Sequence, residues 1–522
     1  MRAKRRRLHG AENRALRGYA PLVVLVAALI AMVAVVPSRV PAGLAASGGG
    51  EAVEVSEAQP ASGWNSSVTA CPDQDKQVPD MPYSPPCYAF AGDNGGETSN
   101  GVNADTVNIS YRLTGDENLL KILADLGGVP LDESNEEMER TMEGLVDYFN
   151  ENFQFYGRRL ELQRYTGRGN VLAELQSGGQ EDATGDAVTA ANDVGAFADV
   201  TGWSQPFADA LARNKVISVG APYMSREWLV AHRPYAWSNY PDCTITTEAA
   251  TNYNIARLSG RPAAFASGDL AGRERKLALV VPNNNEYRQC ADSGDRILSG
   301  VGQEVDLRLE YLLDTAQLQS QASTILSKLK AENITSVAMA TDPILAVYLV
   351  EQARQQNYQP EWVLLGTGFT DFDLVGQVIA ESSGEEWNHA FGTSTSGTPV
   401  PFGESDAYQA FKSVRPDEEP STLVDLIYHQ IYLVALGIQM AGPELTPETF
   451  EAGMFAYPGG TGQYGHWDFD EEHYAGTTDV REMWWDPEAV SPFNGRPGTY
   501  VDHDDRWDID EIPDGDPQVF GG

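Results

Sequence analysis

The chain has 522 residues, of which 42% are hydrophobic, so it holds enough apolar material for a large core and for more than one domain. Its net charge of −39 argues against nucleic acid or an anionic lipid surface as a partner. The acidic residues are spread along the chain, as on the solvated surface of a soluble protein.

The first 46 residues join a basic start to an apolar run. MRAKRRRLHGAENRALRG leads into an unbroken apolar run from Leu22 to Val36, and small residues surround Ala46. The run is shorter than the roughly 20 residues of an ordinary membrane span. Residues 1–46 are therefore predicted to be a signal peptide, cleaved near Ala46, or a retained signal anchor. The protein is expected outside the cytoplasm, and only this segment would contact the membrane.

Residues 47–104 are rich in Gly, Ser, Pro, Asn and Asp, which predicts a flexible linker. The four cysteines are Cys71, Cys87, Cys243 and Cys290. An even number of cysteines in an exported chain favours two disulfides over zinc, because no CxxC pair is present. Three connectivities are open, and proximity in the chain favours Cys71 with Cys87 and Cys243 with Cys290.

From residue 105 onward, short apolar strands alternate with amphipathic helices. The expected strands are residues 106–113, 159–165, 196–201, 215–220, 277–281, 305–311, 334–341 and 361–366. Helices of 10 to 20 residues between strands imply parallel sheets with helices on both faces. About 400 residues of this pattern exceed one ordinary domain, so two sheets are expected.

Two later segments need separate interpretation. Residues 422–442 are apolar almost all round, but Asp425, His429, Gln430 and Gln439 interrupt the run, which favours a buried core helix over a membrane span. Residues 491–522 are predicted to be a solvated acidic tail. DHDDRWDID within it lacks the glycine and the final glutamate of the known calcium loop.

Polar residues follow five of the apolar runs directly. They are TGWSQ, APYMS, NNNEY, TDP and TGFTD, beginning at residues 201, 221, 283, 341 and 367. Each alone is compatible with an ordinary helix cap. Together they predict a shared cleft, because ligands of parallel sheets bind beyond the carboxyl ends of the strands. No GxSxG, GxxxxGK[ST] or HExxH is present, and no GxGxxG follows a strand, so no enzyme, cofactor or metal site is expected.

The order and the local sequences of these segments resemble those of the type I periplasmic binding proteins, especially the branched-chain amino acid binding proteins of ABC importers. The resemblance covers about residues 105–489 and includes KLALVVPNNNEY and GQYGHWDFDEEHYAG. It implies an α/β protein of two doubly wound lobes, joined by three hinge crossovers and closing on a ligand. Lobe 1 would hold residues 105–243 and 390–458, and lobe 2 residues 244–389 and 459–490.

The resemblance also implies which residues bind the ligand. Thr201 and Ser204 would hold a carboxylate, and Tyr287 would pack on the ligand. The complete implied set is Thr201, Gly202, Trp203, Ser204, Ala221, Tyr223, Asn285, Tyr287, Thr341, Asp342 and Phe369. Amino-acid-binding relatives carry a glutamate near the place of Gly368, so the resemblance does not extend to an amino-acid ligand. Asp342 and Asp371 are the carboxylates that could replace it.

The expected function is that of an extracytoplasmic solute-binding protein that closes on a small polar or amphipathic ligand and presents it to an ABC permease. The alternative is a membrane-tethered sensory or cell-surface interaction protein that uses the same fold. No cysteine for lipid attachment follows the apolar run.

Overall fold

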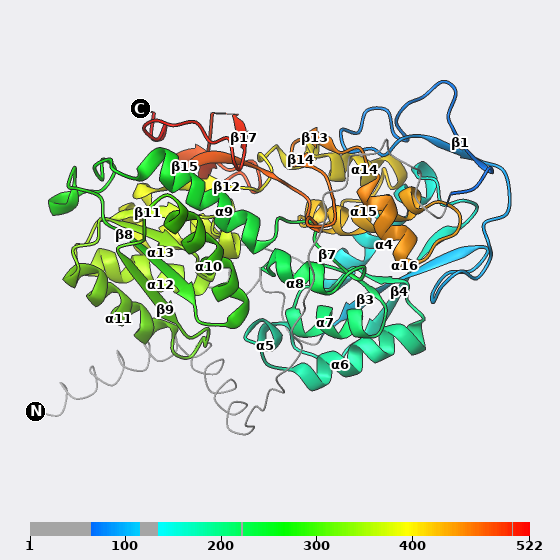
Figure 1. The fold of residues 1–522 in the computed structure, drawn as a ribbon, viewed down its shortest axis with the longest axis horizontal. Coiled ribbons are helices and arrows are strands. Elements are labelled where there is room, and N and C mark those ends of the chain that lie inside the picture. The colour runs from blue at the N-terminus through cyan, green and yellow to red at the C-terminus, as the bar shows by residue number, and fades with distance from the viewer. Residues whose placement is uncertain (1–63, 115–133, 221–222, 504, 522) are drawn as a thin grey trace, which may run out of the picture.

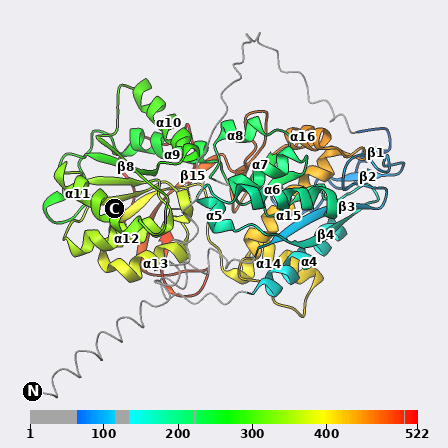
Figure 2. The same ribbon diagram turned by 90° about the horizontal axis from the view of Figure 1, so that it is seen from below.

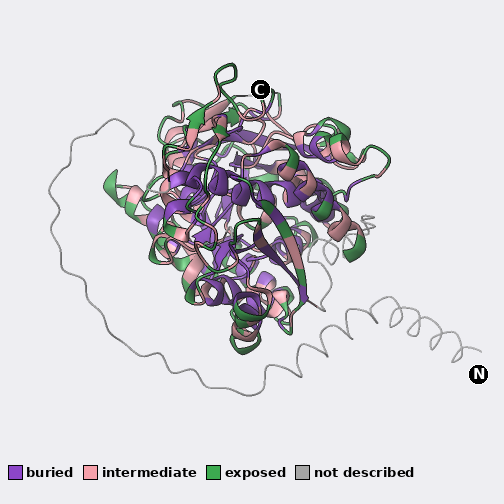
Figure 3. Ribbon diagram, turned by 90° about the vertical axis from the view of Figure 1, so that its right-hand side faces the viewer, coloured by how far each residue is buried: buried purple, intermediate pink, exposed green. Residues whose placement is uncertain are grey.

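The computed structural model describes residues 64–114, 134–220, 223–503 and 505–521. They form two lobes side by side, each built on a sheet with helices on both faces (Figure 1). Buried residues concentrate in the interior of these layers (Figure 3). The predicted signal or anchor at residues 1–46 lies outside the described residues.

The sheet of lobe 1 is parallel, with the strand order β4-β3-β5-β6-β7. Its strands are β3 (Thr106–Leu113), β4 (Arg159–Thr166), β5 (Ala198–Asp199), β6 (Ile217–Val219) and β7 (Ala236–Trp237). Its helices are α4 (Asn135–Asn152), α5 (Val171–Leu175), α6 (Gln180–Val188), α7 (Gln205–Arg213), α8 (Arg226–Ala231), α14 (Asp406–Val414), α15 (Val424–Ala441) and α16 (Pro447–Phe455). The predicted alternation of strands and helices is confirmed here.

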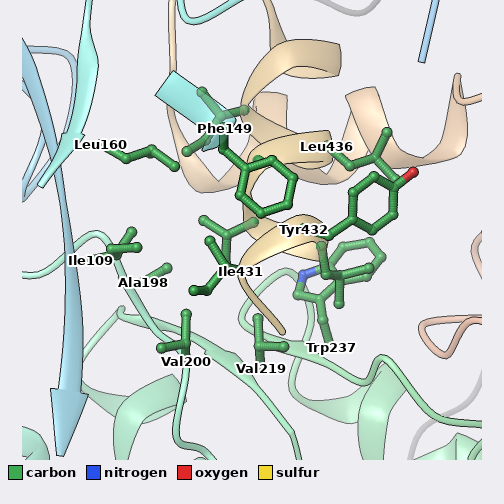
Figure 4. Close-up of a cluster of buried hydrophobic side chains, with 14 of the residues drawn as sticks. Ile109, Phe149, Leu160, Ala198, Val200, Val219, Trp237, Ile431, Tyr432 and Leu436 are labelled. Carbon is green, nitrogen blue, oxygen red and sulfur yellow. The ribbon is translucent and has the colours of Figure 1, made fainter. Parts of the chain in front are cut away.

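Helix α15 forms the centre of lobe 1. Among the described residues it is the helix long and apolar enough to cross a membrane, but 89% of it is buried inside the protein. Ile431, Tyr432 and Leu436 pack toward Phe149 of α4 and Ile109 of the sheet (Figure 4). Its polar Gln439 accepts a hydrogen bond from the Gln154 backbone N–H at 3.0 Å. The predicted buried core helix is confirmed.

The sheet of lobe 2 has the order β16-β15-β12-β11-β10-β8-β9, and β17 also pairs with β15. The strands are β8 (Leu277–Pro282), β9 (Leu307–Tyr311), β10 (Ser336–Met339), β11 (Glu361–Leu364), β12 (Ala390–Ser394), β15 (Asp479–Val490), β16 (Pro497–Val501) and β17 (Arg506–Asp508). The helices are α9 (Cys243–Tyr253), α10 (Asn285–Gly300), α11 (Leu318–Ala331), α12 (Pro343–Gln355) and α13 (Asp373–Ser383). Strands β8 to β12 are parallel, and β15 runs antiparallel to β12.

The region predicted as a solvated acidic tail differs in the structure. It supplies β16 and β17 to the sheet of lobe 2. Tyr500 is 3% exposed and its ring lies 5.0 Å from that of Trp485, so burial of aromatic side chains orders this segment in spite of its charge. Strand β12, placed by prediction at the start of the second part of lobe 1, pairs with β11 and β15 of lobe 2.

The predicted flexible linker also differs over its described part, residues 64–104. Strands β1 (Val68–Ala70) and β2 (Tyr88–Phe90) pair, and the Cys71–Cys87 disulfide joins their ends. Tyr83 is 3% exposed within the core of lobe 1, and the Trp64 indole N–H donates to the Met440 carbonyl at 2.9 Å. Buried aromatic side chains therefore attach this glycine-rich segment to lobe 1.

Three segments cross between the lobes: residues 238–242 after β7, residues 395–405 after β12, and residues 468–478 before β15. The hairpin of β13 (Gly460–Gly462) and β14 (Gly465–Trp467) precedes the third crossing. The second strand of this hairpin ends at Trp467, whose side chain joins the core of lobe 1, although the resemblance placed residues from 459 onward in lobe 2. The expected class, two doubly wound α/β lobes with three crossovers, is confirmed, and antiparallel strands extend one edge of lobe 2.

Candidate functional site

A cavity of about 170 Å³ lies where the two lobes meet. Its floor is the carboxyl edge of β8, β10 and β11, adjacent parallel strands whose following loops meet at one place. Helix α5 of lobe 1 supplies Leu172, Leu175 and Gln176 to the opposite wall. Figure 2 shows α5 at the boundary between the lobes.

Aromatic side chains from different segments face one another at this cavity. Tyr223 of lobe 1 stacks on Tyr287 of lobe 2, with ring centroids 5.8 Å apart and planes 17° apart. Tyr240, on the first crossing, contacts Phe369 edge to face at 6.3 Å. These four rings line the cavity and give it flat apolar walls.

Polar contacts connect the lobes beside the cavity. Ser177, just after α5, accepts a hydrogen bond from the Asn284 side-chain amide at 2.8 Å and donates to Glu286 at 3.1 Å. Ser225 of lobe 1 donates to Gln289 of α10 at 3.1 Å. The lobes therefore touch through short side chains next to the rings.

The polar groups of lobe 2 differ in how far they are satisfied. Asp342 accepts hydrogen bonds from the backbone of Ile344 and Leu345 at the start of α12 and from the Tyr311 hydroxyl at 2.6 Å. Burial raises the pKa of Asp342 and of Asp371. Asp371 accepts through Oδ2 from two serine hydroxyls, whereas its Oδ1 and the Thr341 hydroxyl oxygen are buried without a partner.

Glycine is required in the loop after β11. Gly368 has a φ of +59°, and a Cβ built there would lie 2.4 Å from the Thr341 carbonyl oxygen. Any side chain at position 368 would force this loop to move. The position near which the resemblance placed a glutamate therefore has no room for that residue.

The lobe 1 residues predicted to hold a carboxylate are turned inward. The Thr201 hydroxyl donates to Asp199 at 2.6 Å, and the Ser204 hydroxyl donates to Glu174. Glu174 in turn accepts two hydrogen bonds from Arg112, at 2.8 and 3.0 Å. This buried network occupies the hydroxyl groups that the sequence assigned to a ligand.

The structure thus divides the predicted ligand-binding residues. Those that line the cavity are Tyr223, Tyr287, Thr341, Asp342 and Phe369. Those placed outside its lining are Thr201, Gly202, Trp203, Ser204 and Asn285, whereas Ala221 lies outside the described residues. Ligand contact by any of them stays a prediction. Sequence reasoning missed Tyr240, Leu172 and Ser396, and it named Asp371 only as a substitute for the glutamate.

The first crossing ends in a fully buried carboxyl group beside the cavity, that of Asp242. Asp242 caps α9 through Oδ1, which accepts from the Ile245 backbone N–H at 2.8 Å, while its Oδ2 is buried without a partner. Burial raises the pKa of Asp242 to about 6. The next residue, Cys243, is bonded to Cys290 of α10, as proximity in the chain suggested, and both line the cavity.

Replacing Asp242 with asparagine is expected to stabilise the protein at neutral pH. A carboxyl group whose pKa is higher in the folded than in the unfolded state lowers the free energy of unfolding of the protein as pH rises from about 4 to about 6. Above that pH the loss is complete. Asparagine keeps the capping oxygen and carries no charge. The free energy of unfolding of Asp242→Asn should exceed that of the wild type by up to about 3 kcal/mol at pH 8 and should match it near pH 4.

Urea unfolding of both proteins between pH 4 and 8 measures this difference. The exposed Asp417 offers the control, because Asp417→Asn should stay close to the wild type throughout. A difference in free energy of unfolding between Asp242→Asn and the wild type that does not change with pH would contradict the raised pKa of Asp242.

No family model matches this chain, and no curated protein matches it. Solved structures do. A fatty acid ABC transporter substrate-binding protein from Thermomonospora curvata has a TM-score of 0.55 at 11% identity, covering 81% of this chain and 98% of that one. A solute-binding protein from R. palustris in complex with 4-hydroxybenzoate has a TM-score of 0.54 at 13% identity, covering 77% and 97%. An ABC transporter substrate-binding protein from Aeropyrum pernix has a TM-score of 0.54 at 15% identity, covering 78% and 97%.

Proposed function

We propose that this chain, whose two lobes have the fold of the type I periplasmic binding proteins, is an extracytoplasmic solute-binding protein that serves an ABC importer. The observation that carries the proposal is the cavity between the lobes, with Tyr223 and Tyr287 stacked at its side. A ligand between these lobes would contact both, so its binding would favour the closed arrangement by its differential affinity.

The ligands named for the structural neighbours support a small molecule as the occupant. They include a fatty acid, 4-hydroxybenzoate and 3,4-dihydroxybenzoic acid. Each joins an apolar body to polar groups, as the cavity joins aromatic walls to buried oxygens. These ligands differ among themselves, so they support a solute-binding role. The identity of the solute has to be inferred from the residues that line the cavity.

Two disulfides and the basic and apolar N-terminal segment support a location outside the cytoplasm. N-terminal sequencing of the protein recovered from its host tests how it is held there. A new N-terminus near residue 47 means a cleaved signal, and an intact start means an anchor.

A thermal-shift screen of the full-length protein tests the function. The compounds should include amines, alcohols, amino acids, fatty acids, aromatic acids and sugars at millimolar concentration. A solute present at 100 times its Kd stabilises the folded protein by about 2.7 kcal/mol, which raises Tm by several degrees. A screen in which no compound raises Tm overturns the proposed function.

Changing Tyr287 to alanine is expected to weaken solute binding at least tenfold while leaving the fold intact. The variant loses the ring that stacks on Tyr223 at the side of the cavity, and aromatic side chains carry a large share of binding energy at such sites. Calorimetric titration with any solute from the screen measures the loss. Tyr348 of α12 packs against the core of lobe 2 away from the cavity, so Tyr348→Ala is the matched control and should keep the wild-type affinity. Equal affinities for Tyr287→Ala and the wild type would place the solute elsewhere.

A further inference from the structure

The described lining of the cavity holds carboxyl groups and no basic side chain. Among the described residues that line it, the charged side chains are Asp342 and Asp371, and none is Lys or Arg. A carboxylate ligand would have to leave water for a lining with two carboxyl groups and no basic side chain. Arg481 acts on Asp371 from outside the lining, but its guanidinium is already paired with Asp502. The composition of the wall therefore opposes an anion.

The buried basic group Arg112 of lobe 1 is not free to compensate. Arg112 is 5% exposed and is held by Glu174 at 2.8 Å and Asp186 at 3.3 Å, and its guanidinium lies 3.6 Å from the centre of the Phe207 ring. Two carboxylates already pair with it. The hydroxyls of Thr201 and Ser204 likewise donate to carboxylates of the protein. Lobe 1 therefore offers no unused donor from this cluster to an anionic ligand.

Lobe 2, in contrast, has buried oxygens without a hydrogen-bond partner on two residues that line the cavity, Asp371 and Thr341. Asp371 is 4% exposed, and its Oδ2 accepts from Ser394 and Ser396, each at 2.7 Å. Ser394 Oγ accepts from the Ser396 backbone N–H at 3.0 Å, so its own hydrogen is directed at Asp371. The second carboxyl oxygen, Oδ1, has no partner.

The second buried oxygen without a hydrogen-bond partner is the hydroxyl oxygen of Thr341, a residue that is 2% exposed. Thr341 and Asp371 both line the cavity. Buried polar atoms without a partner are costly, and a ligand that donates to them removes that cost. The Asp371 oxygen therefore favours a ligand that donates a hydrogen bond, and the Thr341 hydroxyl can pair with the same ligand group as donor or acceptor.

The remaining wall sets the size and character of the ligand. Leu279, Val281, Leu365 and the aromatic rings make most of it apolar. Cavities of about 150 Å³ with such walls accept benzene, so about 170 Å³ has room for one ring and a short substituent.

We propose that the solute is a small, mainly apolar amine or alcohol without a carboxylate, and that Asp371 Oδ1 and Thr341 Oγ1 bind its amino or hydroxyl group. This inference rests on the proposed function and narrows it. It separates this chain from neighbours whose named ligands are acids.

Three probes of one shape test the charge preference: 2-phenylethylamine, 2-phenylethanol and phenylacetate. Each is titrated calorimetrically into the full-length protein at pH 7.5. The amine and the alcohol are expected to bind at least ten times more tightly than phenylacetate. Phenylacetate binding as tightly as the amine overturns the inference.

Two variants test the assigned atoms. Asp371→Asn should weaken the amine at least tenfold and shrink its advantage over phenylacetate, because the carboxyl group beside the ligand is replaced by a neutral amide. Thr341→Val keeps the shape of the side chain and should weaken the amine and the alcohol three- to tenfold. The matched control is Thr393→Val, because Thr393 is also buried with an unpartnered hydroxyl but does not line the cavity, and its affinities should equal those of the wild type.

The outcomes separate the two proposals. Unchanged selectivity in Asp371→Asn, together with unchanged affinity in Thr341→Val, overturns the assignment of these atoms. If none of the three probes binds while another compound in the screen does, the inference fails and the proposed function stands. If nothing in the screen binds, both fail.

Discussion

Replacing Arg112 with methionine is expected to lower the free energy of unfolding by about 3–5 kcal/mol. The guanidinium is buried with the carboxylates of Glu174 and Asp186, and the variant leaves both without their cation. Asp199 lies in the same cluster, and burial already raises its pKa. Methionine fills similar space, so the loss reports the charge rather than a cavity.

Denaturant unfolding, followed by tryptophan fluorescence, measures this loss. The control is Arg164→Met on the adjacent strand β4, where Arg164 is about half exposed and pairs with Glu139 at 2.7 Å. An exposed pair of this kind contributes at most about 1 kcal/mol. If both variants lose the same small amount, the Arg112 cluster is solvated and the structure of that region is wrong.

Removing the Cys243–Cys290 disulfide by changing both residues to alanine is expected to destabilise the protein by about 4 kcal/mol. The bond closes a loop with a sequence separation of 47, and loop-closure entropy of the unfolded chain predicts a loss of this size. Both sulfurs line the cavity and tie the start of α9 to α10, so solute affinity should fall as well.

The other disulfide supplies the matched comparison. Cys71 and Cys87 have a sequence separation of 16, which predicts a smaller loss of about 3 kcal/mol, and neither lines the cavity. The double alanine variant at this pair should keep the wild-type solute affinity. Equal affinities in both variants would show that the Cys243–Cys290 bond does not support the cavity.

Local sequence was sufficient for the elements and for the edge at which the cavity lies. LALVV predicted a buried strand, and β8 is one. NNNEY after it predicted a cleft loop; its last three residues instead begin α10, and Tyr287 in that first turn lines the cavity. These predictions hold because they depend on near neighbours in the chain and on one rule of geometry, that adjacent parallel strands end together. The pairing of the cysteines was favoured by the same proximity.

Tertiary structure alone decided where charged and polar groups find their partners. The hydroxyl of Ser204 follows a strand as Thr341 does, and the two are locally alike. The Ser204 hydroxyl donates a hydrogen bond to Glu174, which lies 30 residues away in the chain. The Thr341 hydroxyl has no hydrogen-bond partner, and Thr341 lines the cavity. Likewise, Tyr83 and Tyr500 order segments whose composition predicts a linker and a tail, because each meets a core built from distant residues. A hydrogen bond or a buried ring depends on what arrives from elsewhere in the chain, and local composition does not carry that information.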